Sequence, residues 1–442
     1  MARRRRNKLP PEPVNTTIQS LSHEGRGIAS IDGKTTFIFG ALPGEDVEFV
    51  YTSKRGSHDE GKTTAVLTAA PERVEPQCPH FTICGGCSLQ HLDHGEQIKH
   101  KQQVLLDHLR HFGKLTPNEV LEPLTGPAWG YRNKARLGVR YVFKKDSTLV
   151  GFRERGSAFL AVIDQCEILN PRVGQLITPL RELIHEFENK REIAQIEVSI
   201  GDTDVALVFR NLVELTDDEK TALINFGQQH NIQIFLQPAG PASVYKLYPN
   251  DDTNYLTYSL PDFDLTMQFH PMDFTQVNTD INRKMVKRSV DFLQLTKEDT
   301  VLDLFCGLGN FTLPIATQAK HVVGVEGSDL MTERAGMNAK ANKLSNVEFH
   351  AANLMESIDE FEWAKQHYDK ILLDPPRSGA EMLVQQIERF NASLIVYVSC
   401  NPATLARDAA ILAEKGYKLN KAGIMDMFPH TSHVESIAVF SK

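Results

Sequence analysis

The feature that most constrains the fold is a regular alternation of strand and helix patterns that begins after Phe269. Short apolar runs of strand length are each followed by a segment whose apolar residues have helical spacing. Strands separated by helices imply right-handed crossovers and a parallel sheet that is covered on both faces. Residues 270–442 are therefore predicted to form one α/β domain. The predicted strands are 301–305, 321–327, 347–353, 370–376, 394–400 and a last one within 432–442.

The rest of the chain divides into further domains. At roughly 150 residues per domain, 442 residues suggest two to four domains, and we expect three. Short alternating runs from Val14 to about Ala70 predict a first domain, residues 1–72, made of a basic tail and an OB-like β-barrel. Beyond a proline-rich boundary at 71–80, a central domain is expected at 73–95 and 125–269.

Helices are sparse in these first two thirds. The central domain is predicted to be rich in strands, with one helix near 173–189. An amphipathic helix over 96–112 belongs to a segment, 96–124, that we expect to pack on the α/β domain. The predicted fold class is thus multidomain α/β.

Charge and hydropathy exclude some classes of protein. No apolar run is long enough to cross a bilayer, and the basic start lacks the apolar stretch of a secretory signal, so we expect a cytoplasmic protein without a membrane partner. The net charge of −8 argues against a globally electrostatic nucleic-acid binder.

Two local segments are nevertheless basic: Arg3 to Arg6 with Lys8, and residues 129–156. The second segment carries eight Lys or Arg against two acids, with aromatic residues interleaved, which suits phosphate contacts beside stacked bases. An amphipathic hairpin whose solvated face is basic explains the second segment equally well.

Ligands of open α/β sheets bind beyond the carboxyl ends of the strands. Gly307 and Gly309 follow the first strand and allow a tight turn near a ligand, although Thr312 stands where a dinucleotide site would need a third glycine. Glu326 closes the second strand, where an acid can take ribose hydroxyls, or it is a solvated strand-end acid. Asn353 closes the third strand. Asp374, before Pro375 and Pro376, ends the fourth, either at the pocket edge or in a turn without chemistry.

Six cysteines in a reduced chain indicate metal binding or catalysis rather than disulfides. Cys78, Cys84 and Cys87 share one short loop, and Cys166 can supply a fourth thiolate. Their spacing leaves tetrahedral zinc and an iron–sulfur cluster about equally open, and simple packing is the less favoured alternative.

The combination of DPPR (374–377), VSCNPATLARD (398–408) and FPHTSHVESIAVF (428–440) resembles the RNA uracil-carbon-5 methyltransferase family, and 301–400 resembles a class I, Rossmann-like methyltransferase domain. The loop CPHFTICGGCSLQH (78–91) with Cys166 is similar to the 4Fe-4S site of bacterial 23S rRNA members, and the barrel is similar to an RNA-binding TRAM domain. This resemblance implies methylation of an unpaired or flipped-out uracil in 23S rRNA, without a stable protein partner. It also implies that the contacts to S-adenosylmethionine are made by Gln276, Phe305, Asn310, Glu326, Asn353 and Asp374.

Carbon 5 of uracil is a poor nucleophile, so a thiolate must first add at carbon 6, and a base must later remove the carbon 5 proton. Cys400 lies between an apolar strand and a helix start, where we expect its thiolate to be favoured, whereas Cys306 in the glycine loop is expected to pack. Without that position, a cysteine on a strand would more often be packing. Glu435 is the predicted base by resemblance; from its pattern alone, a partly exposed strand glutamate is as good a reading. RNA cytosine methylation also needs an attacking cysteine, and a non-catalytic RNA-binding iron–sulfur protein is the third hypothesis.

Overall fold

The computed structural model describes residue 9 and residues 12–442, so the basic residues Arg3 to Arg6 and Lys8 lie outside the described part. The chain divides into two compact units. The first unit combines residues 1–101, 154–156 and 428–433, and the second comprises 102–153, 157–427 and 434–442. Helix α1 (His94–His111) continues from the first unit into the second.

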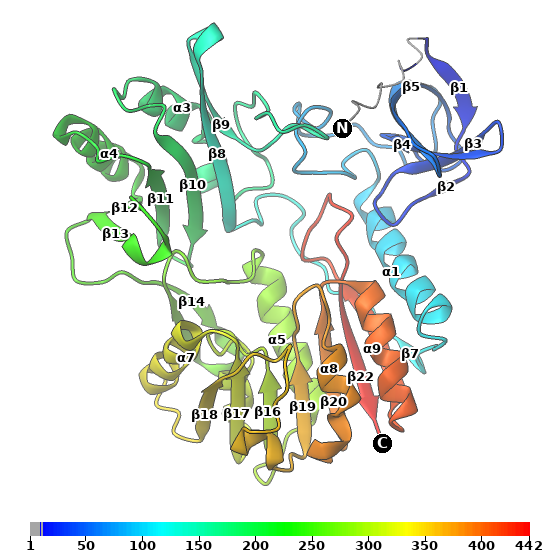
Figure 1. Cartoon of the computed structure of the whole chain (residues 1–442), viewed down its shortest axis with the longest axis vertical. Helices are drawn as coiled ribbons and strands as arrows, with labels where there is room; N and C mark the ends of the chain where they lie inside the picture. The colour runs from blue at the N-terminus through cyan, green and yellow to red at the C-terminus, as the bar shows by residue number, and fades with distance from the viewer. Residues whose placement is uncertain (1–8, 10–11) are drawn as a thin grey trace, which may run out of the picture. The chain divides into compact units, whose positions relative to one another are not determined.

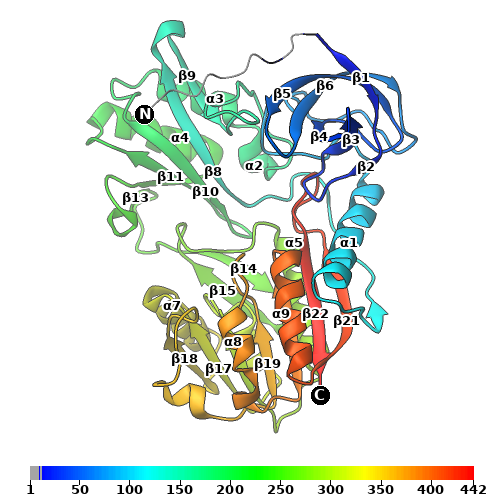
Figure 2. The same ribbon diagram turned by 45° about the vertical axis from the view of Figure 1, so that its right-hand side comes forward.

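A six-stranded sheet forms the body of the first unit, in the order β1-β5-β6-β4-β3-β2. All neighbours are antiparallel except β4 and β6, and Figure 2 shows the sheet strongly curled. Ile18, Ile38, Val47 and Phe49 fill its core. Its strands are β1 (Val14–Thr17), β2 (Ser20–Leu21), β3 (Gly27–Ile31), β4 (Lys34–Phe39), β5 (Asp46–Lys54) and β6 (Asp59–Thr68).

The segment 428–433 is tied into this unit although it lies near the end of the sequence. The carbonyl of His430 accepts hydrogen bonds from the amides of Ser88 and Leu89, at 2.9 and 3.0 Å. The amide of His430 in turn donates to Gln97 Oε1 at 2.9 Å. The backbone of 428–433 is thus satisfied by residues that come more than 300 positions earlier in the sequence.

The second unit contains a central sheet in the order β13-β12-β11-β10-β8-β9 and a separate hairpin. The expectation of one helix in this region is wrong, because α4 forms as well, with a capping box between Thr216 and Glu219. The strands are β8 (Lys134–Val142), β9 (Ser147–Gly151), β10 (Ile193–Ile200), β11 (Val205–Asn211), β12 (Gln233–Leu236), β13 (Tyr245–Tyr248), β14 (Leu256–Leu260) and β15 (Leu265–Phe269); the helices are α2 (Pro171–Gly174), α3 (Ile177–His185) and α4 (Asp217–His230).

The second unit also contains an eight-stranded sheet in the order β18-β17-β16-β19-β20-β22-β21-β7 (Figure 1). The five strands from β18 to β20 are parallel, as predicted, and their apolar runs are mostly buried. The strands are β16 (Thr300–Leu304), β17 (His321–Glu326), β18 (Val347–Ala351), β19 (Lys370–Leu373), β20 (Leu394–Ser399), β21 (Lys418–Met425), β22 (Glu435–Ser441) and β7 (Glu119–Val120).

The far edge of this sheet departs from the prediction. The last strand, β22, runs antiparallel to β20, and β21 runs antiparallel to β22. Strand β7 comes from the segment 96–124 and pairs in parallel with β21. Neither β21 nor β7 was expected from the sequence.

Helices cover both faces of the sheet, as a doubly wound domain requires. Figure 1 shows α8 and α9 on the near face and α5 behind the strands. The helices are α5 (Thr279–Leu293), α6 (Thr312–Ala316), α7 (Asp329–Ala341), α8 (Glu381–Gln385) and α9 (Pro402–Glu414). Short 3-10 turns lie at Phe143–Lys145, Pro241–Ser243, Pro261–Phe263, Glu362–Lys365 and Ile387–Phe390. Within residues 12–442, no helix combines the length and apolarity needed to cross a membrane.

Candidate active site

The loop after β16 turns sharply at the carboxyl edge of the parallel sheet. Phe305 has a φ of 69°, and the amides of Phe305 and Cys306 both donate to the carbonyl of Val325, at 2.8 and 3.0 Å. Gly309, with a φ of 93°, has no room for a side chain, since a Cβ there would lie 2.5 Å from Leu313 Cδ1. The loop is therefore held tightly against β17 and the start of α6.

Glu326 stands directly beside this loop at the end of β17. Its Oε2 accepts a hydrogen bond from the Gly307 amide at 3.2 Å. A Cβ on Gly307 would meet no atom within 4 Å, so the space over this glycine is open. An open backbone surface next to a half-buried carboxylate fits a ligand that carries a ribose.

Two carboxyl groups beneath the loop have unusual proton affinities. Burial is the main cause that raises the pKa of Asp303 to about 7, and burial together with Asp303 raises the pKa of Asp374 to about 7. Thr312, which replaces the third glycine of a dinucleotide motif, donates its hydroxyl hydrogen bond to Asp303 Oδ2. The threonine therefore has a structural use at this position, as the partner of a buried acid.

Asn310 belongs to a polar network that the sequence did not reveal. Tyr258, on β14, donates from its hydroxyl to Asn310 Oδ1 at 2.8 Å. Asn310 and Asn282, on α5, exchange two amide hydrogen bonds of 2.9 and 3.1 Å. Both Tyr258 and Asn282 are buried, so they fix the orientation of the Asn310 amide at the mouth of the loop.

Gln276 lies in the loop 270–278, between β15 and α5. Arg334 anchors this loop through a buried ion pair, with 2.9 Å between its Nε and Asp273 Oδ2. Lys134 donates to the carbonyl of Pro271 at 2.9 Å, and burial lowers the pKa of this lysine to about 8. The anchored loop leaves Gln276 half-buried and Phe274 71% exposed.

Asn353 is placed differently from the other predicted cofactor residues. It follows β18 by two residues and is exposed. Its side chain accepts from the Met355 amide at 3.1 Å and donates to Glu356 Oε1 at 2.7 Å. In this structure the Asn353 amide therefore serves a local turn.

Cys400 immediately follows β20, and Asn401 caps the start of α9. The predicted position between strand and helix is thus confirmed, but the expectation of a favoured thiolate is wrong for this arrangement. Burial, with Glu435 and Asp374 nearby, raises the pKa of the Cys400 thiol to about 11, although Arg377 acts in the opposite direction. The side chain of Asn401 accepts a hydrogen bond of 3.1 Å from the Ala403 amide at the start of the helix, so this amide is not available to the Cys400 sulfur.

Glu435 is the first residue of β22. Because Ser399 pairs with Ser436 across the antiparallel strands, Cys400 and Glu435 extend the same register by one position at the sheet edge. The charge of Glu435 acts on Cys400 directly. A thiol and a carboxylate from neighbouring strands thus share the edge that carries Asp374. Cys306, which we expected to pack rather than to react, is buried in the glycine loop, and burial raises its pKa well above the ordinary value.

The cysteine loop belongs to the first unit. Arg155 stacks on Phe39, with 3.7 Å to the ring centre, and donates to the carbonyls of Cys84 and Cys87. The Cys84 sulfur accepts from the Gly86 amide at 3.4 Å, and burial raises the pKa of this thiol. Cys166, the fourth predicted ligand, belongs to the second unit. Four thiols suit a cluster in their chemistry, but within residues 12–442 no three cysteine, histidine or acidic side chains are grouped as metal ligands.

Comparison with known proteins shows the family of the chain. The family described as tRNA (Uracil-5-)-methyltransferase matches residues 93–442. Two relatives are both named 23S rRNA (uracil(1939)-C(5))-methyltransferase RlmD. The one from Hahella chejuensis is 58% identical over 443 residues and covers 99% of each chain; the one from Legionella pneumophila strain Lens is 54% identical and covers 98% of each.

A solved structure supports the fold. The Pyrococcus abyssi tRNA (uracil-54, C5)-methyltransferase, determined with S-adenosyl-L-homocysteine, superposes with a TM-score of 0.73. It is 23% identical, and the match covers 97% of this chain and all of that one. The Rossmann-like α/β architecture is therefore shared. The chain belongs to the RNA uracil-5-methyltransferase family, in the group whose curated members are called RlmD.

Proposed function

We propose that the chain transfers the methyl group of S-adenosylmethionine to carbon 5 of a uracil in 23S rRNA, in the cytoplasm. The names of its relatives support this substrate, because they give uracil 1939 of 23S rRNA as the methylated base, and the matches cover nearly the whole length of each relative. The observation that carries the chemistry is the register that brings Cys400 and Glu435 together beside Asp374.

The cofactor would be held by residues of the carboxyl edge. Glu326 offers carboxylate oxygens to the ribose over the open surface of Gly307. Asp374, which directly follows β19, and Asn310, in the loop after β16, belong to the same proposed set. Phe305, Gln276 and Asn353 complete the proposed set, and Asn353 must first leave its local turn. When bound, S-adenosylmethionine supplies an electrophilic methyl group.

Cys400 acts first in the proposed reaction. Its thiolate forms a bond to carbon 6 of the uracil, and the electrons of the double bond move toward carbon 5 and the neighbouring carbonyl. Carbon 5 then uses this electron pair to bond the methyl group, whose bond to the sulfonium sulfur breaks and leaves its electron pair on that sulfur. Glu435 accepts the proton from carbon 5, the electrons of that bond restore the ring double bond, and the thiolate leaves carbon 6.

The target base must be outside a stacked helix for this attack, because a ring carbon within a duplex cannot be reached. The electrostatics of Cys400 add a second requirement. With a pKa of about 11, the thiol must lose its proton before or during the attack on carbon 6. The positive charge of Arg377 stabilises the thiolate of Cys400 and therefore assists this step.

We further propose that Cys78, Cys84, Cys87 and Cys166 hold a 4Fe-4S cluster with a structural role. The support is the donor set of four thiols and the arginine that organises the carbonyls of Cys84 and Cys87. Iron and sulfide analysis of anaerobically prepared protein should give four of each per chain, whereas zinc would show a different metal. Cys84→Ser is expected to lower the melting temperature sharply, and a well-folded but inactive variant would refute the structural role.

The proposed function is tested by incubating the protein with unmodified 23S rRNA and labelled S-adenosylmethionine. Nucleoside mass spectrometry should find 5-methyluridine, and mapping should place it at one position. Methylcytidine without methyluridine would instead establish cytosine as the target. Cys400→Ser is expected to reduce methyl transfer by about 10⁴-fold or more while it retains cofactor binding, and normal turnover of this variant would refute the mechanism.

A further inference from the structure

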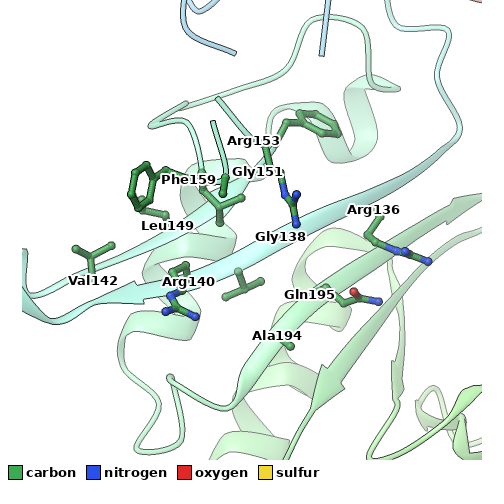
Figure 3. Close-up of a pocket in the computed structure, with 14 residues that line it drawn as sticks. Arg136, Gly138, Arg140, Val142, Leu149, Gly151, Arg153, Phe159, Ala194 and Gln195 are labelled. Carbon is green, nitrogen blue, oxygen red and sulfur yellow. The ribbon is translucent and has the colours of Figure 1, made fainter. Parts of the chain in front are cut away.

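The outer face of the central sheet carries a groove that the chemistry described above does not use. It has a volume of 680 Å³ and is lined by residues of β8, β9, β10 and the segment 152–160 (Figure 3). Along β8 the side chains alternate: Ala135, Leu137 and Val139 are buried, whereas Arg136 and Arg140 are exposed. The groove therefore lies on the face of β8 opposite to its core-facing side chains.

Two paired glycines lie beneath this groove. Gly138 pairs with Gly151 on β9 and with Gln195 on β10, so the middle of the sheet face lacks bulky side chains. Leu160 lies directly on Gly138, because a Cβ on this glycine would come within 2.7 Å of its Cδ2. Ile163 covers Gly151 in the same way, since a Cβ there would come within 2.7 Å of its Cδ1, so apolar side chains lie against both glycines.

Arginines supply the charge of the groove. Arg136, Arg140 and Arg153 line it and are exposed. Arg136 pairs with Glu197, but neither Arg140 nor Arg153 pairs with a carboxylate of residues 12–442. Two guanidinium groups without an acidic partner are available to an anion, and their planar forks match phosphate oxygens.

Apolar side chains lie beside these cations. Phe159 is 76% exposed, and Figure 3 shows it next to Leu149 at the end of the groove away from Arg136. An exposed aromatic ring of this kind offers a surface on which a base can stack. The combination of an exposed aromatic ring and two arginines without carboxylate partners matches a nucleotide chain, in which every unit carries both a base and a phosphate.

We propose that this groove binds a short single-stranded segment of the substrate RNA, apart from the nucleotide that is methylated. The identification of the RNA rests on the proposed function. Phosphates lie against Arg140 and Arg153, and one base stacks on Phe159. A segment of duplex does not fit, because its bases are stacked on one another and cannot reach the ring.

The test compares an Arg140→Ala/Arg153→Ala variant and a Phe159→Ala variant with the wild-type chain. The probe is an unmodified 23S rRNA transcript, and the dissociation constant is measured between 50 and 200 mM salt, a range in which phosphate contacts dominate changes in affinity. Each variant should bind about tenfold more weakly or worse. For the double arginine variant the salt slope should also fall by about 0.7 per lost phosphate contact.

Two matched variants control for nonspecific effects. Lys320→Ala removes an exposed cation next to the amino end of β17, and Phe112→Ala removes an exposed ring after α1; both should bind RNA like the wild type. Melting temperatures show whether each variant folds. At saturating RNA, the groove variants should keep the wild-type kcat, since the groove lies outside the reacting groups.

Unchanged affinity and salt slope in the folded arginine variant would overturn the proposal. Competition adds a second criterion. Single-stranded oligonucleotides should displace the transcript from the wild type more strongly than from the variants. If a perfect duplex displaced the transcript from the wild type as strongly as a single strand does, the proposal would also be overturned. The outcomes stay separate from the proposed function. If the variants lost RNA binding but the wild type did not methylate the RNA, only the proposed methylation would be refuted. If the wild type methylated the RNA but the variants bound it as tightly as the wild type, only the groove proposal would be refuted.

Discussion

Asp303 is buried and Asp374 is half-buried at the carboxyl edge of the parallel sheet, whereas the arginines on the outer face of the central sheet are exposed. At the first region, burial raises the pKa values of two carboxyl groups and one thiol. At the second, unpaired cations face water. A low-dielectric environment thus sets the proton affinities of the proposed reacting groups, and salt screens their interactions only weakly. The proposed RNA contacts, in contrast, are sensitive to salt. The contrast also shows how a chain with a net charge of −8 can offer a basic surface.

After Cys400→Ser, the largest effect on turnover is expected at Glu435. Glu435→Gln removes the acceptor of the carbon 5 proton but leaves Cys400 able to add to the ring. Turnover should fall by about 10² to 10⁴-fold. A covalent protein–RNA adduct should then accumulate, visible as a slower band on a denaturing gel.

Glu362→Gln, in an exposed pair with Lys365, serves as the matched control and should behave like the wild type. If Glu435→Gln turned over normally and formed no adduct, another group would have to take the proton.

The proton affinity of Cys400 can be measured by alkylation at different pH values. Because the thiolate reacts and the thiol pKa is about 11, the rate of iodoacetamide modification should rise about tenfold per pH unit from pH 7 to 10. Mass mapping of the peptide separates Cys400 from the other five cysteines. A plateau below pH 8 would mean that the helix start stabilises the thiolate after all.

Asp303 links the catalytic edge to stability. Its folded-state pKa of about 7 lies above the ordinary 3.8, so the stability that it contributes is present at low pH and is lost as the pH rises through about 7. Asp303→Asn cannot ionise. At pH 8 its free energy of unfolding should exceed that of the wild type by on the order of 1–3 kcal/mol.

The difference for Asp303→Asn should shrink toward pH 4, as followed by chemical denaturation without cofactor. A variant that is less stable than the wild type at pH 8 would show that the ionised carboxylate is favourable where it lies.

The smallest effect is expected at Tyr258. Tyr258→Phe deletes the hydroxyl that orients Asn310, and one such hydrogen bond is worth roughly 1 kcal/mol. The dissociation constant for S-adenosylmethionine, measured by calorimetry, should therefore rise about two- to tenfold. Tyr368→Phe removes a buried hydroxyl bonded to Trp363 instead and should leave this constant unchanged. Equal losses of cofactor affinity in both variants would point to general destabilisation.

The parallel half of the catalytic sheet was predictable because its strands are nearly continuous apolar runs with both faces buried. Strand β21 was not, since Lys418, Asn420 and Lys421 interrupt its pattern near the sheet edge. Helix α4 was missed because its apolar residues are few, although the capping box of Thr216 and Glu219 marks its start.

The candidate site was predictable in its residues more than in its electrostatics. Short motifs place Cys400, Glu326 and Asp374 at the carboxyl ends of their strands, and the structure agrees: Glu326 is the last residue of β17, and the other two directly follow β20 and β19. The proton affinity of Cys400 depends on carboxyl groups from two other strands, which only the folded register brings near. The partnership of Tyr258 with Asn310 likewise joins residues 52 positions apart, and no local pattern announces it.

The first unit is formed by segments that are far apart in the sequence, and this has a consequence for truncation of the chain. Three separate stretches of chain build it, and the last of them, 428–433, ends two residues before β22 begins at Glu435. Deleting the amino-terminal hundred residues would strip away Gln97 and the amides that satisfy His430, just ahead of the strand that begins with Glu435. Exchanging the first unit between relatives therefore requires exchanging all three stretches at once, and a simple truncation would destabilise the start of the strand that carries the proposed base.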